Sequence, residues 1–229
     1  MFIQEPIPQV TRKHYPKSFL YSVAIMLTYD GDDVLDVHSN DIIKFMQNQQ
    51  WVLSKKDESG MVFEKNTLAL VLHEKVVLLS IPKSSYSGFD TLSAEFSDIE
   101  EVLKISRAQK IINVFINKIN RYLIKKELVK SREWVFSQLF SEHFLKAYEE
   151  ATGVMALSGS LLTLFNVKES EKGDICAYDF SISVSKVDNR GLGIFTKTAY
   201  EINDSMFSAW DWAVSGNVKK MMEGLIHDG

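Results

Sequence analysis

The order in which strand-like and helix-like segments follow one another is the feature that most constrains how this chain can fold. Residues 19 to 29 alternate strictly, with aromatic and β-branched side chains on one face, which predicts a half-buried strand. Ser39 or Asn40 can then cap a short helix. Three strands are predicted next, at residues 51–55, 61–73 and 76–81. An amphipathic helix follows, with apolar residues at Phe89, Leu92, Phe96, Ile99 and Leu103.

The same order repeats after residue 108. Residues 111–124 are rich in isoleucine and suit a long strand, although they also match one face of a helix. A helix is predicted at about 132–151, followed by three strands and a last helix from residue 204 that breaks at 215–217. The three strands are predicted at 154–167, 175–187 and 192–201, with a hairpin turn at 188–191 between the last two.

We therefore expect an α+β fold of two similar strand-helix-three-strand-helix halves, 1–108 and 109–229, in which a mostly antiparallel sheet is packed by amphipathic helices. No linker rich in Pro, Gly or Ser lies near residue 108, so the halves are expected to share one core. The sheet face away from the helices is left for solvent, a ligand or another chain.

Cysteine and histidine usage excludes several kinds of metal and redox site. Cys176 is the only cysteine, so neither a disulfide within the chain nor a four-cysteine zinc site can form. No histidine lies three or four residues from another His or Cys, and the acid cluster Asp30, Asp32, Asp33 and Asp36 lacks the ligand spacing of a calcium loop. We expect no metal and no cofactor.

The N-terminus lacks the pattern of a secretory signal, and no apolar run approaches the ~20 residues that span a bilayer. These observations predict a cytoplasmic protein without a membrane partner.

Positive charge is concentrated in one segment. Between Lys104 and Arg132 nine basic residues face one acid, so this segment carries +8 and the rest of the chain −12. If these side chains cluster, they form a surface for phosphates or for an acidic protein face. The candidates for this anionic-partner surface are Lys118, Arg121, Lys125, Lys126 and Lys130.

Catalytic motifs are not evident. The run Ser158-Gly159-Ser160 lies within a strand pattern rather than at a strand-to-helix elbow, and Gly191-Leu192-Gly193 lacks the third glycine of a phosphate loop. We assign no catalytic residue and leave enzymatic activity open, although we favour its absence. Among the tryptophans, Trp212 lies off the apolar stripe of the last helix, so it marks a candidate interface.

Three short stretches of the chain resemble a sporadically distributed family of uncharacterised bacterial proteins of about this length. They are the opening strand at 16–23, the stretch 86–89 leading through a helix to a strand that ends at 119–122, and a final helix after Tyr200 with Phe207 and Trp210. The family has an Arg-Tyr-Ile-Asn type of strand end, where this chain has Arg121-Tyr122-Leu123-Ile124. The resemblance implies a bacterial origin and a regulatory, defence-associated or accessory role, and it transfers no catalytic residue.

The leading hypothesis is a non-enzymatic binding or regulatory protein that engages a macromolecule through the open sheet face or the basic segment. A protein partner is favoured over nucleic acid, because the net charge is −4 and no base-stacking motif accompanies the cations. The alternative is a small-molecule binder or enzyme with a pocket between the sheet and the last helix. The sequence leaves the oligomeric state open.

Overall fold

A computed structural model describes the chain except residues 1, 4–6, 12, 14, 16, 17, 32–37, 150–153, 159, 188–190 and 226–229. The chain forms two compact units, each built from separate stretches of sequence. Unit 1 contains residues 1–21, 118–184 and 204–229, and unit 2 contains residues 22–117 and 185–203.

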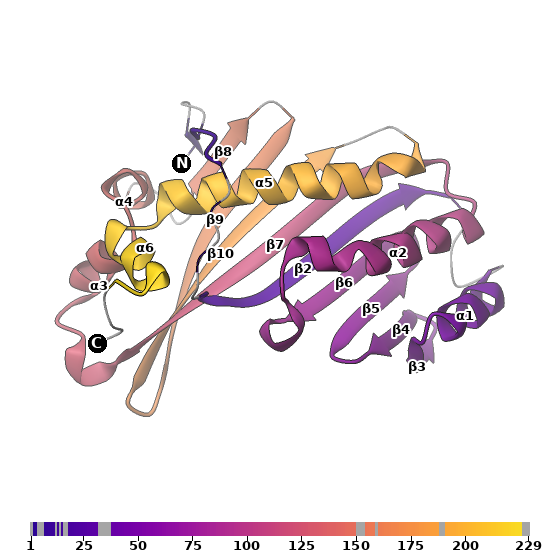
Figure 1. The fold of residues 1–229 in the computed structure, drawn as a ribbon, viewed down its shortest axis with the longest axis horizontal. Coiled ribbons are helices and arrows are strands. Elements are labelled where there is room, and N and C mark those ends of the chain that lie inside the picture. Colours follow the sequence, from indigo (N-terminus) through magenta and orange to yellow (C-terminus); the bar gives the residue numbers. More distant parts are fainter. Residues whose placement is uncertain are drawn as a thin grey trace. The chain divides into compact units, whose positions relative to one another are not determined.

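Unit 2 is a meander of strands behind two helices. Its sheet order is β7-β2-β6-β5-β4-β3, and the four strands after α1 pair antiparallel with their neighbours. Figure 1 shows α1 and α2 on the same face of this sheet. The elements are β2 (Leu20–Asp30), α1 (Ser39–Asn48), β3 (Val52–Asp57), β4 (Gly60–Lys65), β5 (Leu68–His73), β6 (Val76–Pro82), α2 (Ser93–Ile105) and the first half of β7 (Lys110–Lys125). Two 3-10 turns, Lys83–Ser85 and Phe89–Leu92, lead into α2.

The two faces of the unit 2 sheet differ. On the face under the helices, the apolar side chains of β2, β4, β5 and β6 are buried, and Phe96 of α2 packs edge-on against Phe195 at a centroid distance of 5.4 Å. On the opposite face, register places four half-buried apolar side chains in one cross-strand row. These are Met26, Leu78, Val71 and Val62.

Unit 1 has a shorter sheet in the order β1-β8-β9-β10-β7. Its core is a set of aromatic rings from helix and strand, in which Phe144 contacts Phe140, Phe165 and Phe180 at centroid distances of 5.0, 5.7 and 5.5 Å. The elements are β1 (Phe2–Ile3), α3 (Arg132–Leu139), α4 (Glu142–Glu149), β8 (Val154–Ser158), β9 (Leu161–Lys172), β10 (Ile175–Val187), the second half of α5 (Phe195–Ala213) and α6 (Gly216–Glu223). The first half of α5 belongs to unit 2. The short 3-10 turns Lys126–Leu128 and Leu192–Ile194 precede α3 and α5.

The expected fold class is confirmed: the protein is α+β, with a mostly antiparallel sheet packed by amphipathic helices. The isoleucine-rich segment is the strand β7 and not a helix. In the sheet, β2 lies beside β6, and β7 lies beside β10. In each half of the chain, the strand that precedes the first helix therefore neighbours the last of the strands that follow that helix. Whether the halves 1–108 and 109–229 superpose or share one core stays a prediction.

Two strand predictions were too long. The segment 61–73 is the hairpin β4–β5, because Asn66 adopts a left-handed conformation with φ of 57° and turns the chain. The segment 154–167 divides into β8 and β9, which pair antiparallel. The predicted helix at 132–151 is likewise interrupted between α3 and α4.

The strand predicted at 192–201 is wrong, because α5 begins at Phe195. Phe195, Ala199 and Ile202 recur at helical spacing and are completely buried, so one helical face satisfies the core where an alternating strand would expose half of it. Of the predicted turn at 188–191, residues 188–190 lie outside the described part of the chain. None of the described helices is long and apolar enough to cross a membrane.

Candidate functional site

The basic segment folds against acidic side chains. Arg121 of β7 donates two hydrogen bonds to the Asp179 carboxylate of β10, at 2.6 and 2.7 Å, and its guanidinium lies 3.5 Å from the centroid of the Tyr21 ring. These hydrogen bonds raise the pKa of Arg121 above its usual value, so the cation is permanent, yet its donors face a carboxylate. Arg121 is therefore engaged within unit 1.

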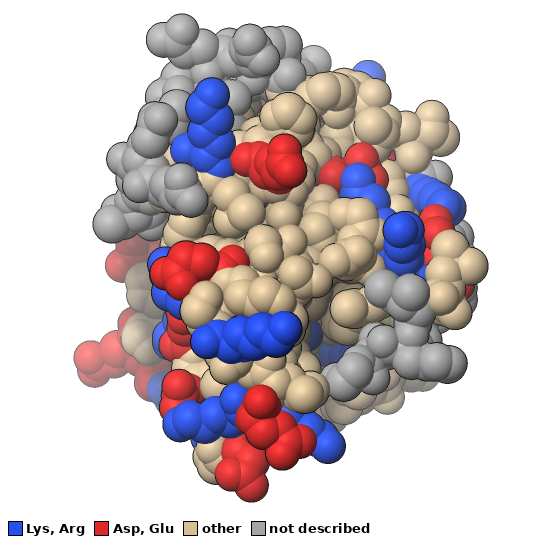
Figure 2. Space-filling view, turned by 90° about the vertical axis from the view of Figure 1, so that its left-hand side faces the viewer, with Lys and Arg blue, Asp and Glu red and all other residues tan. Residues whose placement is uncertain are grey.

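The other cations of the basic segment, among them the remaining candidates Lys118, Lys125, Lys126 and Lys130, are only partly available. Lys126 pairs with Glu171 at 2.8 Å, and Arg132 pairs with Glu169 at 2.6 Å, so β9 supplies an acid for each. Lys118 is half-buried, Lys125 is exposed, and Lys130 lies 5.5 Å from the centroid of the Trp134 ring. On the described part of the face drawn in Figure 2, Lys and Arg lie among Asp and Glu and form no continuous patch of one sign.

Trp212, the predicted interface residue, lies near the end of α5 and is half-buried. One side of its indole packs on the core, with centroid distances of 5.7 Å to Phe165 and 6.1 Å to Phe144. Its remaining surface lines a cavity. The sequence identified this residue because it falls off the apolar stripe, and the structure assigns it to a pocket wall.

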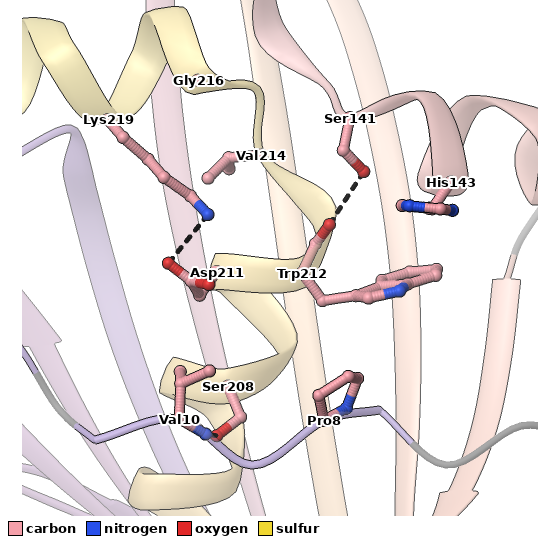
Figure 3. Close-up of a pocket in the computed structure, with 10 residues that line it drawn as sticks. All are labelled: Pro8, Val10, Ser141, His143, Ser208, Asp211, Trp212, Val214, Gly216 and Lys219. Carbon is pink, nitrogen blue, oxygen red and sulfur yellow. Dashed lines mark hydrogen bonds and ion pairs between the residues drawn. The ribbon is translucent and has the colours of Figure 1, made fainter.

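This cavity, which we call the Trp212 pocket, has a volume of about 350 Å³ and lies wholly within unit 1. Its walls come from the N-terminal arm, the start of α4 and the corner between α5 and α6 (Figure 3). The lining residues are Pro8, Val10, Ser141, His143, Ser208, Asp211, Trp212, Val214, Gly216 and Lys219.

Two helix breaks, held together by backbone hydrogen bonds, form the rigid corner of the pocket. Two hydrogen bonds join the break between α5 and α6 to the break between α3 and α4. The Ser141 amide donates to the Ala213 carbonyl at 2.8 Å, and the Ser215 amide donates to the Leu139 carbonyl at 3.0 Å. Ser215 also caps α6 by accepting a hydrogen bond from the Val218 amide at 3.2 Å. The predicted break at 215–217 is thus confirmed, and it fixes the direction in which α6 leaves the pocket.

The N-terminal arm closes another side. The Val10 amide donates to the Ser208 hydroxyl at 3.1 Å, and Tyr15 packs edge-on against Trp210 at a centroid distance of 5.4 Å. Further along, Lys13 forms an ion pair with Glu223 of α6. These contacts hold Pro8 and Val10 against the helix (Figure 3).

The polar groups of the lining differ in how far they are already used. The Ser141 hydroxyl donates to the Trp212 carbonyl at 2.8 Å and accepts from the Phe144 amide at 3.2 Å. The Ser208 hydroxyl accepts from Val10 and also donates within unit 1. Both hydroxyls are therefore committed to the fold, and Ser141 does not direct its proton to His143.

Asp211 and Lys219 form an ion pair at 2.8 Å on the side of the pocket opposite the Trp212 indole (Figure 3). Their side chains are 27% and 30% exposed, so both still face the cavity. An ammonium has three donors and a carboxylate accepts about four hydrogen bonds, so the pair keeps donors and acceptors for a ligand. His143 lies exposed at the rim.

Unit 2 contains a similar trio of a tryptophan, an aspartate and a lysine, but this trio leaves no open pocket between its members. The Trp51 indole donates to the Asp98 carboxylate at 2.9 Å, and Lys65 lies 3.9 Å from the same carboxylate and 5.5 Å from the centroid of the Trp51 ring. Trp51 is 2% exposed and Asp98 is 7% exposed. This trio ties β4 and α2 together and has little surface for a ligand.

Buried Tyr122 of unit 1 is a second polar group inside a core. Burial raises the pKa of its phenol above the usual value. The nearby Trp210 indole lowers this pKa, but by less than burial raises it, and the Tyr122 hydroxyl makes no hydrogen bond of normal geometry with any described residue. The phenol therefore stays neutral and does not act as a base.

Sequence reasoning missed most of the pocket. Asp211, Lys219 and Gly216 carry no local motif, and their neighbours across the cavity come from residues 8–10 and 141–143. In the described part of the chain, no group of three or more His, Cys, Asp and Glu side chains is placed to hold a metal ion. The thiol of Cys176 is buried.

No family model and no curated protein matches the chain. The regulatory subunit of aspartate kinase from Thermus flavus aligns with 84% of this chain and 93% of its own, at 9% identity and a TM-score of 0.24. Aspartate kinase from Clostridium acetobutylicum aligns with 83% of this chain and 33% of its own, at 10% identity and a TM-score of 0.23. This chain thus matches about a third of the second protein, and at these TM-scores neither likeness carries an inference.

Proposed function

We propose that this chain is a binding protein without catalytic activity, and that the Trp212 pocket is its binding site. One observation carries the proposal: a cavity of about 350 Å³ in which a rigid, half-buried indole faces an ion pair that is only partly satisfied. Ligand sites are typically concave and mostly apolar, with a few placed polar groups, and this volume lies near the lower end of their range. The expected occupant is a small molecule or one small group of a larger partner.

The chemistry of the lining supports binding over catalysis. Nucleophilic catalysis by a serine needs a hydroxyl that donates its proton to a base. The hydroxyls of Ser141 and Ser208 instead donate to backbone carbonyls within the fold. The pairing of Arg121, Lys126 and Arg132 with carboxylates also argues against a phosphate surface on the basic segment. A macromolecular partner, the cytoplasmic location and an accessory role in bacteria stay proposals.

The test uses the four tryptophan indole N–H signals as reporters in the intact chain. Trp212→Phe identifies the Trp212 signal, and a set of small ring compounds is then titrated. We expect at least one compound to shift the Trp212 signal saturably while the other three signals stay in place.

Gly216 offers a matched pair of variants for this test. A Cβ at Gly216 would meet no atom within 4 Å, so Gly216→Ala fits without strain, whereas Gly216→Leu adds a branched side chain at a residue that lines the cavity. Binding should survive in Gly216→Ala and disappear in Gly216→Leu. Equal binding in both variants, or no saturable shift with any compound, contradicts the proposed site.

A further inference from the structure

On the wall opposite the Trp212 indole, Asp211 and Lys219 supply the charged donor and acceptor that line the pocket. Because their charged groups lie 2.8 Å apart, the pocket presents an acceptor directly beside a donor. A ligand matches this pattern when its own donor and acceptor lie side by side on one edge. Lactams and the pairing edges of nucleobases have this arrangement, with a ring N–H next to a carbonyl oxygen.

The opposite wall favours a flat ring. The Trp212 indole is held by Phe165 and Phe144 on its inner side, so its outer surface keeps one orientation. Bases and other planar heterocycles stack on aromatic side chains regardless of their exact identity. A ring that contacts Trp212 with its face can direct its polar edge toward Asp211 and Lys219, because the two walls lie on opposite sides of the same cavity (Figure 3).

The charge of the lining favours a ligand without net charge. Asp211 and Lys219 neutralise each other, and they remain partly exposed, so a ligand with one net charge gains little attraction here. The cavity volume of about 350 Å³ also favours one ring or two fused rings over an extended molecule.

We infer that the Trp212 pocket recognises a neutral planar heterocycle whose edge carries an N–H donor beside a carbonyl acceptor. This inference rests on the proposed function and specifies the chemistry of its ligand. The Trp212 indole contacts the ring face, the Asp211 carboxylate accepts from the ring N–H, and the Lys219 ammonium donates to the carbonyl. The ring can come from a free base or nucleoside, or from an unpaired base of a single strand.

Uracil and uracil methylated on both ring nitrogens form the matched pair of probes, because methylation keeps the ring and its carbonyls but removes the N–H donors. The Trp212 indole signal reports binding. We expect the methylated ring to bind about tenfold more weakly than uracil, the loss that one missing hydrogen bond of this kind causes.

Two variants assign that loss to the ion pair. Asp211→Asn removes the charged acceptor of the ring N–H, so it should weaken uracil binding by about tenfold and leave the methylated ring nearly unaffected. Lys219→Met removes the donor to a carbonyl that both rings keep, so it should weaken binding of both rings by about tenfold. Thermal unfolding of each variant checks that the fold is kept. For the source of the ring, uridine is compared with a short oligouridylate: equal binding at all salt concentrations indicates a free base or nucleoside, and tighter, salt-sensitive binding indicates a single strand.

Equal affinity for the two uracils, or unchanged uracil binding in both variants, would overturn edge recognition while other ring compounds at Trp212 still supported the pocket. If no ring compound shifts the Trp212 signal, the edge and the binding site are both wrong. Uracil binding that persists in Gly216→Leu places the ring outside the pocket and overturns the inference as well.

Discussion

Each unit combines a tryptophan, an aspartate and a lysine, and the two trios differ in what surrounds them. In unit 2, the Trp51 indole donates directly to the carboxylate of Asp98 in α2, and both side chains are buried. In unit 1, Trp212 and Asp211 follow each other on α5 but point to opposite sides of a cavity, and Lys219 pairs with Asp211 at the surface (Figure 3). The same residue types thus form a buried, hydrogen-bonded cluster in unit 2 and line an open pocket in unit 1.

The difference shows that residue type alone does not separate a structural cluster from a binding site. A buried carboxylate needs partners inside the protein, because losing water costs several kcal/mol unless hydrogen bonds replace it. Asp98 finds those partners in Trp51 and Lys65. Asp211 keeps part of its hydration, so it can exchange water for a ligand.

The largest expected effect separates the two aspartates. Asp98→Ala removes the acceptor of a buried indole N–H and one of the two carboxylates beside Lys65, the other being Glu95 at 3.8 Å, which should lower the free energy of unfolding by about 3 kcal/mol. Asp211→Ala breaks a half-exposed ion pair and should cost less than about 0.5 kcal/mol. Urea denaturation of the two variants measures both values. Similar losses would remove the distinction between a closed and an open trio.

A smaller effect distinguishes the tryptophans. Trp51→Phe deletes the hydrogen bond to Asp98 and some buried surface, with an expected loss of about 2 kcal/mol. Trp212→Phe keeps a ring against Phe165 and Phe144, so it should cost less than about 1 kcal/mol of stability but weaken ligand binding. Urea denaturation measures the stabilities, and ligand-detected magnetisation transfer measures binding without an indole reporter. Strong destabilisation by Trp212→Phe would make this residue structural.

The smallest expected effects on stability come from two glycines, Gly60 in unit 2 and Gly216 in unit 1. A Cβ at Gly60 would lie 2.5 Å from the Leu72 carbonyl oxygen, so Gly60→Ala should cost about 1 kcal/mol or more. Gly216→Ala at the first turn of α6 should instead stabilise the protein by about 0.5 kcal/mol, because alanine restricts the unfolded chain. Thermal denaturation gives both signs. Destabilisation by Gly216→Ala would show that the pocket wall has no room for a Cβ.

The candidate site was predictable only in part. Trp212 could be singled out because it lies off the apolar stripe, and the helix break at 215–217 could be placed because Ser, Gly and Asn interrupt the periodicity. The basic segment was visible as a count of charges, but its neutralising acids Glu169, Glu171 and Asp179 come from the neighbouring hairpin. Strand pairing over such distances leaves no local signal.

By itself, the sequence determined which faces of β2, β7 and the helices become buried, because the period of apolar residues is a local property. It also determined the α+β class through the order of those periods. Only the tertiary structure decided that residues 192–201 form a helix, since the core contact of Phe195 with Phe96 outweighs the local alternation. Only the tertiary structure likewise assembled the Trp212 pocket, because its walls come from residues 8–10, 141–143 and 208–219, which meet through packing and not through sequence.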